Sequence, residues 1–204
     1  MRSTAGPVSQ VDDEARVKLI EKQTVWKNFI HLQTMIFEQQ ARDGRTFRIH
    51  REVHDHGVAA AILLFDPKRG EVVLVRQFRP GAYVNGDPSF LLEIPAGLTD
   101  GDHPDEAIRR ESMEETGYAV SAPRYLFDTY ASPGTLTEKV SLFYARVDLD
   151  VKAGEGGGLE NEGEDIEVLT VPLDAAYDMI ASGEITDSKT IIMLQWAMLN
   201  RASL

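Results

Sequence analysis

Cysteine is absent from the 204-residue sequence, which excludes disulfides, a thiol nucleophile and thiolate metal sites. Positive charge is scarce: 21 Lys and Arg oppose 33 Asp and Glu, a net charge of −12. This balance argues against binding to nucleic acid or anionic lipid. The longest apolar run, Val58 to Phe65, is far shorter than the roughly 20 residues of a membrane span. Met1 to Thr4 contain no apolar signal core, so we expect a cytoplasmic protein with no nucleic acid and no membrane among its partners.

The composition changes along the chain, which is long enough to bury a full hydrophobic core. Residues 1–15 are polar and acidic and predict a disordered tail. Residues 16–53 carry apolar side chains on both sides of the turn signal Arg42-Asp43-Gly44. They predict a small amino-terminal β unit, although residues 17–23 fit either a helix or a strand. Residues 54–204 are expected to form the main domain.

Strand-like and helical runs alternate irregularly through the main domain. The strand-like runs are residues 58–65, 72–78, 90–94, 125–130, 140–147 and 166–171, and the helical runs are Pro104 to Thr116, Leu173 to Ser182 and Ser188 to Arg201. Their irregular order predicts an α/β fold with a mixed β-sheet. The glycine-rich, acidic residues 153–164 are typical of a mobile loop.

Three carboxylates crowd one face of the first predicted helix. Glu111 is followed by Glu114 at i+3 and by Glu115 at i+4, with no Lys between them. Such like charges destabilise a helix unless a divalent cation lies there, and carboxylate oxygens are the ligands that Mg²⁺ and Mn²⁺ prefer. A solvated acidic helix face is the alternative interpretation. The complete pattern around these residues favours the metal site.

This segment resembles the signature of the Nudix hydrolase family, Gly-x5-Glu-x7-Arg-Glu-U-x-Glu-Glu-x-Gly-U, in which U is an apolar residue. The match runs from Gly97 to Tyr118. It departs from the signature twice: Asp102 stands one position early in place of the first Glu, and Ser112 occupies an apolar position. The resemblance implies a Nudix fold, in which a mixed β-sheet is sandwiched between helices.

The family resemblance also implies roles for individual residues. Glu111, Glu115 and the carbonyl of Ala96 would hold the metal, with Arg110 as a structural partner. Glu114 would be an auxiliary ligand or would orient the attacking water. Together with Glu115 it is a candidate catalytic residue.

Further stretches look like one branch of the family, the GDP-mannose pyrophosphatases, which are close to the ADP-ribose pyrophosphatases. These stretches are Arg51-Glu52-Val53, Val75 to Arg79, Val84-Asn85-Gly86, Ser132 to Glu138, residues 156–158, residues 164–168 and residues 179–190. The resemblance implies hydrolysis of a nucleotide sugar, GDP-mannose, to GMP and mannose 1-phosphate. The implied cofactor is Mg²⁺, for which Mn²⁺ would substitute.

The branch resemblance implies substrate-binding positions at Arg51, Glu52, Arg79, Gly97, Leu98, Glu138 and Lys189. Cationic side chains would neutralise phosphate charge, and carboxylates would accept hydrogen bonds from sugar hydroxyls or a guanine edge. Exposed surface charges are the alternative interpretation. In the acidic loop, Glu164 would complete the metal site or take a proton from water. Glu160 and Glu162 remain rivals, because the loop is about two residues longer than the branch pattern.

Two other functions remain open from the sequence. The Nudix segment cannot read the base or the sugar, so ADP-ribose or another ADP-sugar is an alternative substrate. A non-catalytic nucleotide-sugar sensor on the same fold is the second alternative. The branch resemblance further implies a homodimer that exchanges the amino-terminal β unit. His50, His54 and His56 fit a polar strand face better than a zinc site.

Overall fold

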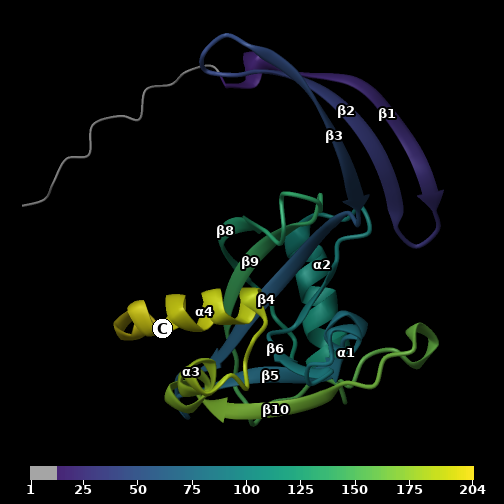
Figure 1. Ribbon diagram of the computed structural model, residues 1–204. Helices are drawn as coiled ribbons and strands as arrows, with labels where there is room; N and C mark the ends of the chain where they lie inside the picture. The colour runs from purple at the N-terminus through teal and green to yellow at the C-terminus, as the bar shows by residue number, and fades with distance from the viewer. Residues whose placement is uncertain (1–12) are drawn as a thin grey trace, which may run out of the picture. The chain divides into compact units, whose positions relative to one another are not determined.

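The computed structural model describes residues 13–204, which fall into two compact units (Figure 1). The first unit holds the described residues up to His56 together with Ser132–Thr137, and the second holds Gly57–Ala131 and Glu138–Leu204. Most of the predicted disordered tail, residues 1–12, lies outside the described residues. At its end, Glu14–Arg16 form a short 3-10 helix.

The first unit is a three-stranded antiparallel sheet in the order β1-β2-β3. Its strands are β1 (Val17–Lys27), β2 (His31–Gln40) and β3 (Thr46–Asp55). Residues 17–23, which fit either a helix or a strand by sequence, are strand and pair with β2. Ser132–Thr137 belongs to this unit because the backbone of His54 bonds it on both sides: His54 donates to the Thr135 carbonyl (2.8 Å) and accepts from the Thr137 N–H (3.0 Å).

The second unit is built on a seven-stranded mixed sheet. Its strands are β4 (Val58–Asp66), β5 (Glu71–Phe78), β6 (Phe90–Glu93), β7 (Ala96–Leu98), β8 (Arg124–Tyr130), β9 (Lys139–Arg146) and β10 (Glu167–Pro172). The main order is β10-β5-β4-β9-β8, with β6 beside β5 and β7 beside β4. The pair β4–β9 is parallel, and the other strand pairs of this sheet are antiparallel.

Between Gly57 and Leu204, four α-helices, a π-helical turn and two 3-10 helices, Glu160–Glu162 and Arg201–Ser203, accompany this sheet. The α-helices and the π-helical turn are α1 (Pro80–Asn85), α2 (Pro104–Glu111), the π-helical turn (Ser112–Thr116), α3 (Leu173–Ser182) and α4 (Ser188–Leu199). The single helix expected from Pro104 to Thr116 is therefore α2 followed by the π-helical turn, which ends at Gly117 with φ +76°. The sequence analysis missed α1, which is only six residues long. Within residues 13–204, no helix has the length and apolar character needed to cross a membrane.

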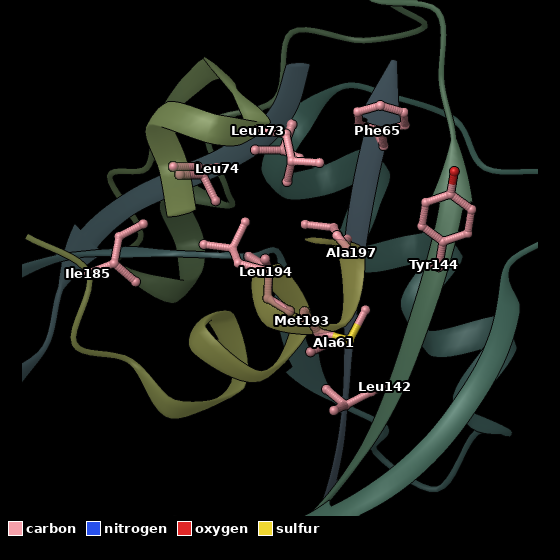
Figure 2. Close-up of a cluster of buried hydrophobic side chains, with 14 of the residues drawn as sticks. Ala61, Phe65, Leu74, Leu142, Tyr144, Leu173, Ile185, Met193, Leu194 and Ala197 are labelled. Carbon is pink, nitrogen blue, oxygen red and sulfur yellow. The ribbon is translucent and has the colours of Figure 1, made fainter. Parts of the chain in front are cut away.

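The central strand β4 explains why the sheet needs helices on both faces. Its apolar run alternates sides, because successive strand residues point to opposite faces. Ala61 and Leu63 join one buried cluster with the α3 and α4 side chains, shown in Figure 2. Ile62 and Leu64 join a second cluster, which includes Ile108 of α2. These four strand side chains have no exposed surface, so the expectation of a mixed sheet between helices is confirmed.

Asp66, at the end of β4, anchors the connections at one edge of the core. Its side chain has no exposed surface, and its carboxylate accepts backbone N–H groups from Lys68 (2.7 Å), Arg69 (3.2 Å) and Leu149 (2.9 Å). Burial raises the pKa of this carboxyl, but the three N–H donors outweigh burial, and the pKa lies below its ordinary value. The ionised form therefore stabilises the fold.

We expect Asp66→Asn to lower the free energy of unfolding at pH 7 by about 1–3 kcal/mol, because an amide accepts these N–H groups less well than a carboxylate. The folded-state pKa is depressed, so the stabilisation is complete above about pH 4 and disappears as the pH falls through the folded-state pKa. Urea unfolding between pH 2 and 7 measures the difference. Asp178→Asn, on the exposed face of α3, is the control. An equal loss of stability at every pH would contradict the assignment.

Candidate functional site

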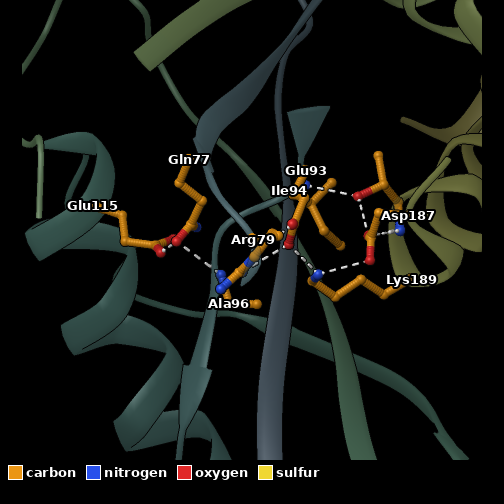
Figure 3. Close-up of polar contacts among 9 residues, drawn as sticks. Gln77, Arg79, Glu93, Ile94, Ala96, Glu115, Asp187 and Lys189 are labelled. Atoms are coloured by element: carbon orange, nitrogen blue, oxygen red, sulfur yellow. Dashed lines mark hydrogen bonds and ion pairs between the residues drawn. The ribbon is translucent and has the colours of Figure 1, made fainter. Parts of the chain in front are cut away.

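Glu115 is the most deeply buried carboxylate of the predicted metal site. It lies in the π-helical turn with 2% of its surface exposed. Its Oε2 accepts the backbone N–H of Ala96 (3.0 Å), and its Oε1 accepts the side-chain N–H of Gln77 (3.3 Å), as Figure 3 shows. Burial raises the pKa of Glu115 to about 8 despite these donors, and the negative charges of Glu111 and Glu164 add to the shift.

Glu111, one helical turn earlier, is also largely removed from solvent. Its side chain is 13% exposed, and its Oε1 pairs with Arg110 (2.7 Å). Arg110 also reaches Glu114 (3.4 Å) and donates to the carbonyl of Leu98 (3.4 Å). Burial raises the pKa of Glu111 to about 7; Arg110 opposes this shift, and the charges of Glu114 and Glu164 reinforce it. The expected role of Arg110 as a partner of these carboxylates agrees with its contacts.

Gly97 gives the Glu111 carboxylate its space. A Cβ at position 97 would overlap all three carboxyl atoms of Glu111. Gly97 pairs with Ala60 in the β4–β7 ladder and does not have a positive φ. The glycine is therefore required for close approach of the helix to β7.

Ser112, one of the two departures from the signature, is buried like the apolar residue it replaces. It has no exposed surface, and its hydroxyl donates to the carbonyl of Tyr118 (2.9 Å). The buried polar group is thus satisfied, and the departure leaves the helix in place.

The donor set of this helix fits a divalent cation of the magnesium type. Glu115 is buried and Glu111 is partly buried, and the pKa of each is raised. The charge of Glu164 contributes to both shifts and that of Glu114 to the shift of Glu111, and a cation would keep these carboxylates ionised. In the conformation described for residues 13–204, no three His, Asp or Glu side chains converge in a ready-made ion site. Glu111 and Glu115 instead bind Arg110, Gln77 and the N–H of Ala96. The carbonyl of Ala96 remains a predicted ligand.

Arg79 and Lys189, two of the predicted substrate-binding residues, meet at the buried carboxylate of Glu93 (Figure 3). Glu93 is 2% exposed and ends β6. Arg79 donates to both of its oxygens (2.7 and 2.8 Å), and the Lys189 ammonium pairs with one of them. Burial raises the pKa of Glu93, but the two cations outweigh it and hold the pKa below its ordinary value. The charges of Glu93 and Asp187, which lies 2.9 Å from Lys189, balance the two cations.

Asp187 and Thr190 fix the same ion-pair cluster to the start of α4. Asp187 caps this helix: its Oδ2 accepts the N–H (2.9 Å) and the hydroxyl (2.6 Å) of Thr190. The Thr190 hydroxyl oxygen in turn accepts the backbone N–H of Ile94 (2.9 Å), the residue after Glu93. These bonds hold Lys189 beside the end of β6, where it shares the Glu93 carboxylate with Arg79, the residue between β5 and α1.

Sequence reasoning missed Glu93 and Gln77. Glu93 lies in the apolar run from Phe90 to Ile94, and an acidic residue in such a run signals a buried, paired carboxylate. Gln77 lies in the stretch from Val75 to Arg79, which the branch resemblance included without giving Gln77 a role.

In the acidic loop, Glu164 differs from Glu160 and Glu162 in its burial and its contacts. Glu164 is half-buried, and its Oε2 accepts the backbone N–H of Leu159 (2.9 Å). Glu160 and Glu162 are exposed on a 3-10 helix, Glu160–Glu162. The charge of Glu164 contributes to the raised pKa of both Glu111 and Glu115. Its side chain packs against Gly158, whose N–H bonds the carbonyl of Glu114 (3.0 Å).

Of the other four predicted substrate-binding residues, Leu98 contacts the helix through its carbonyl, which accepts from Arg110 (3.4 Å). Leu98 is on β7, and Glu138 is a half-buried residue just before β9. Arg51 and Glu52 are exposed on β3 of the first unit, where Arg51 donates to the His50 carbonyl (2.8 Å). All four remain predictions.

Comparison with known proteins identifies the family of the chain. Residues 55–192 match the NUDIX domain. The chain belongs to the NUDIX family.

Named relatives cover almost the whole chain. The GDP-mannose pyrophosphatase of Cronobacter sakazakii is 43% identical over 180 residues, which are 88% of this chain and 93% of the relative. That of Escherichia coli O157:H7 is 42% identical over 186 residues, 91% and 96% of the two chains. The crystal structure of an ADP compounds hydrolase has the same fold, with a TM-score of 0.69, 17% identity and coverage of 92% and 96%. The predicted Nudix fold is confirmed.

We expect Glu93→Gln to lower the free energy of unfolding by about 3 kcal/mol, because it leaves two cations beside a buried group without a charge. Glu167→Gln is the matched control. Glu167 also pairs with an arginine, Arg76 (2.7 Å), but both side chains are about half exposed, and a loss below about 1 kcal/mol is expected. Chemical denaturation at pH 7 measures both values. Equal losses in the two variants would show that the Glu93 cluster does not stabilise the fold.

Proposed function

We propose that this NUDIX hydrolase cleaves the pyrophosphate bond of GDP-mannose and releases GMP and mannose 1-phosphate in a reaction that requires Mg²⁺. The observation that carries the proposal is the pair of buried carboxylates on the signature helix, Glu111 and Glu115, beside a buried cluster that contains two cations. Arg79 is close enough to Glu115 for the carboxylate charge to contribute to its raised pKa. The names of the relatives that are 42–43% identical over most of the chain support the substrate.

The side chains divide into a metal-binding group and a phosphate-binding group. Glu111, Glu115, Glu164 and the Ala96 carbonyl would hold Mg²⁺ or Mn²⁺. When bound, the metal supplies positive charge that polarises the phosphoryl group and makes water a better nucleophile.

Arg79 and Lys189 donate hydrogen bonds that orient the diphosphate, and the Glu93 carboxylate holds both in place. Glu164 takes the proton of the attacking water, and Glu114 orients that water. Arg51, Glu52, Gly97, Leu98 and Glu138 complete the proposed contacts to the base and the sugar.

We expect Glu115→Gln to reduce turnover of GDP-mannose by more than about 100-fold, because an amide binds a divalent cation far less well than a carboxylate. Glu106→Gln, which changes an exposed carboxylate on the first turn of α2, should stay within about twofold of the unchanged protein. Product formation with Mg²⁺ in ¹⁸O-labelled water measures both effects and identifies the phosphorus that is attacked.

The same assay separates the alternatives. Faster initial rates on ADP-ribose or another ADP-sugar than on GDP-mannose would show that the ADP compound, and not GDP-mannose, is the preferred substrate. Ligand-dependent thermal stabilisation without turnover of any nucleotide sugar would indicate a sensor. Turnover that resists a chelator would contradict the role of the metal.

The proposal includes a cytoplasmic homodimer that exchanges the amino-terminal β unit. Every residue of β1 is exposed in the single chain, including Trp26 (57%), and Phe29 in the following turn is 79% exposed. Val17, Leu19, Ile20 and Val25 add to this apolar surface. An uncovered edge strand with these side chains is costly in water and is suited to pairing with a second copy.

We expect sedimentation velocity to show a dimer, and Trp26→Glu combined with Phe29→Glu to shift it toward the monomer by placing charge on the apolar surface. Tyr83→Glu, which changes an aromatic residue 67% exposed on α1, is the control and should remain dimeric. A monomer of the unchanged chain at micromolar concentration would refute the dimer.

A further inference from the structure

A glycine strap, residues 154–158, lies against the end of the signature helix. The strap donates the N–H of Gly157 to the carbonyl of Glu115 (2.9 Å) and the N–H of Gly158 to the carbonyl of Glu114 (3.0 Å). Gly154 donates to the carbonyl of Gly117 (3.1 Å). The last carbonyls of a helix lack partners within the helix, and here the strap supplies them. This part of the loop is therefore anchored, which differs from the mobile loop expected from its composition.

At Gly156 and Gly158 the strap approaches so closely that there is no room for a side chain. A Cβ at Gly156 would lie 2.6 Å from the backbone carbon of Thr116. A Cβ at Gly158 would lie 2.7 Å from both Cβ and Oε2 of Glu164. Both glycines also have positive φ, +72° and +82°, which side chains disfavour.

The strap joins Glu164 to the carboxylates of the helix. Immediately after Gly158, Leu159 donates its N–H to Glu164 Oε2 (2.9 Å), and the N–H of Glu164 returns to the Leu159 carbonyl (3.3 Å). The backbone of Gly158 is thus bonded to Glu114 on one side, and its bare α-carbon packs on Glu164 on the other. The carboxylate of Glu164 is fixed relative to the turn that carries Glu115.

We propose that Gly158 is a positioning residue: its missing side chain lets the strap hold the Glu164 carboxylate against the turn that carries Glu114 and Glu115, from where it completes the proposed site of the divalent cation. This inference rests on the proposed function, in which Glu164 completes the metal site. An alanine at position 158 displaces the carboxylate while leaving every proposed ligand in the sequence.

Manganese binding to the full chain without substrate tests the proposal, with free Mn²⁺ measured by electron paramagnetic resonance. We expect Gly158→Ala to weaken binding by about 10- to 100-fold. Gly163→Ala is the matched control, because Gly163 has a similar φ, +74°, in the same loop but faces open space. It should stay within about twofold. Glu164→Ala should also weaken binding, and adding Gly158→Ala to it should cause no further loss, because the two positions act through one carboxylate.

The outcomes separate the failure of this inference from the failure of the proposed function. Equal affinities for Gly158→Ala and Gly163→Ala, or additive losses with Glu164→Ala, would overturn the role of Gly158 alone. Equal affinities of the unchanged protein and Glu164→Ala would remove Glu164 from the metal site and so overturn both.

Hydrogen exchange of the unchanged protein keeps the proposal testable if Gly158→Ala does not fold. The amides of Gly157, Gly158 and Leu159 should exchange slowly, as helix amides do, because each is bonded to the helix turn or to Glu164. Exchange at the rate of an open chain would overturn the proposal.

Discussion

The burial of negative charge at the end of the signature helix is the constraint on which the rest of the second unit depends. Glu115 has almost no access to solvent, and Glu111 has little. A carboxylate in this position must lose its charge or be compensated, and the surrounding structure supplies only weak compensation through one arginine, one amide and one backbone N–H. Gly97 leaves the space for the Glu111 carboxylate. The glycine strap lies close to the backbone of Glu115 and Thr116 and to the side chain of Glu164.

The hydrophobic pattern of the sequence predicted those strands and helices whose formation depends mainly on their own residues. The apolar run of β4 required two covered faces, and the structure gives it two clusters. The π-helical turn was beyond local reasoning, since its carbonyls bond a strap about 40 residues further along the chain. The short helix α1 was missed although Pro80 at its start and Gly86 at its end mark it, because six residues contain too little periodicity.

In the candidate site, too, residues close together in the sequence were predicted, whereas contacts between residues far apart in the sequence were not. The spacing of Glu111, Glu114 and Glu115 predicted one helical face, and the raised pKa values of Glu111 and Glu115 agree with a charged, buried site. Glu93 escaped notice because its partner Lys189 lies 96 residues away, and only the sheet topology brings them together. Arg79 and Lys189 were selected for phosphate binding by resemblance, whereas the structure shows that each is already paired with a buried carboxylate.

This pairing assigns different tasks to the two charged groups. In the cluster around Glu93, two cations meet two carboxylates, so it carries no excess charge to attract a diphosphate. The helix and loop carboxylates face a single arginine, so their excess is negative. A doubly negative diphosphate therefore meets a site that is neutral on one side and negative on the other, and electrostatics alone disfavours its binding. Divalent cations reverse this balance at the helix, and the fixed directions of Arg79 and Lys189 then orient a ligand that the cations attract.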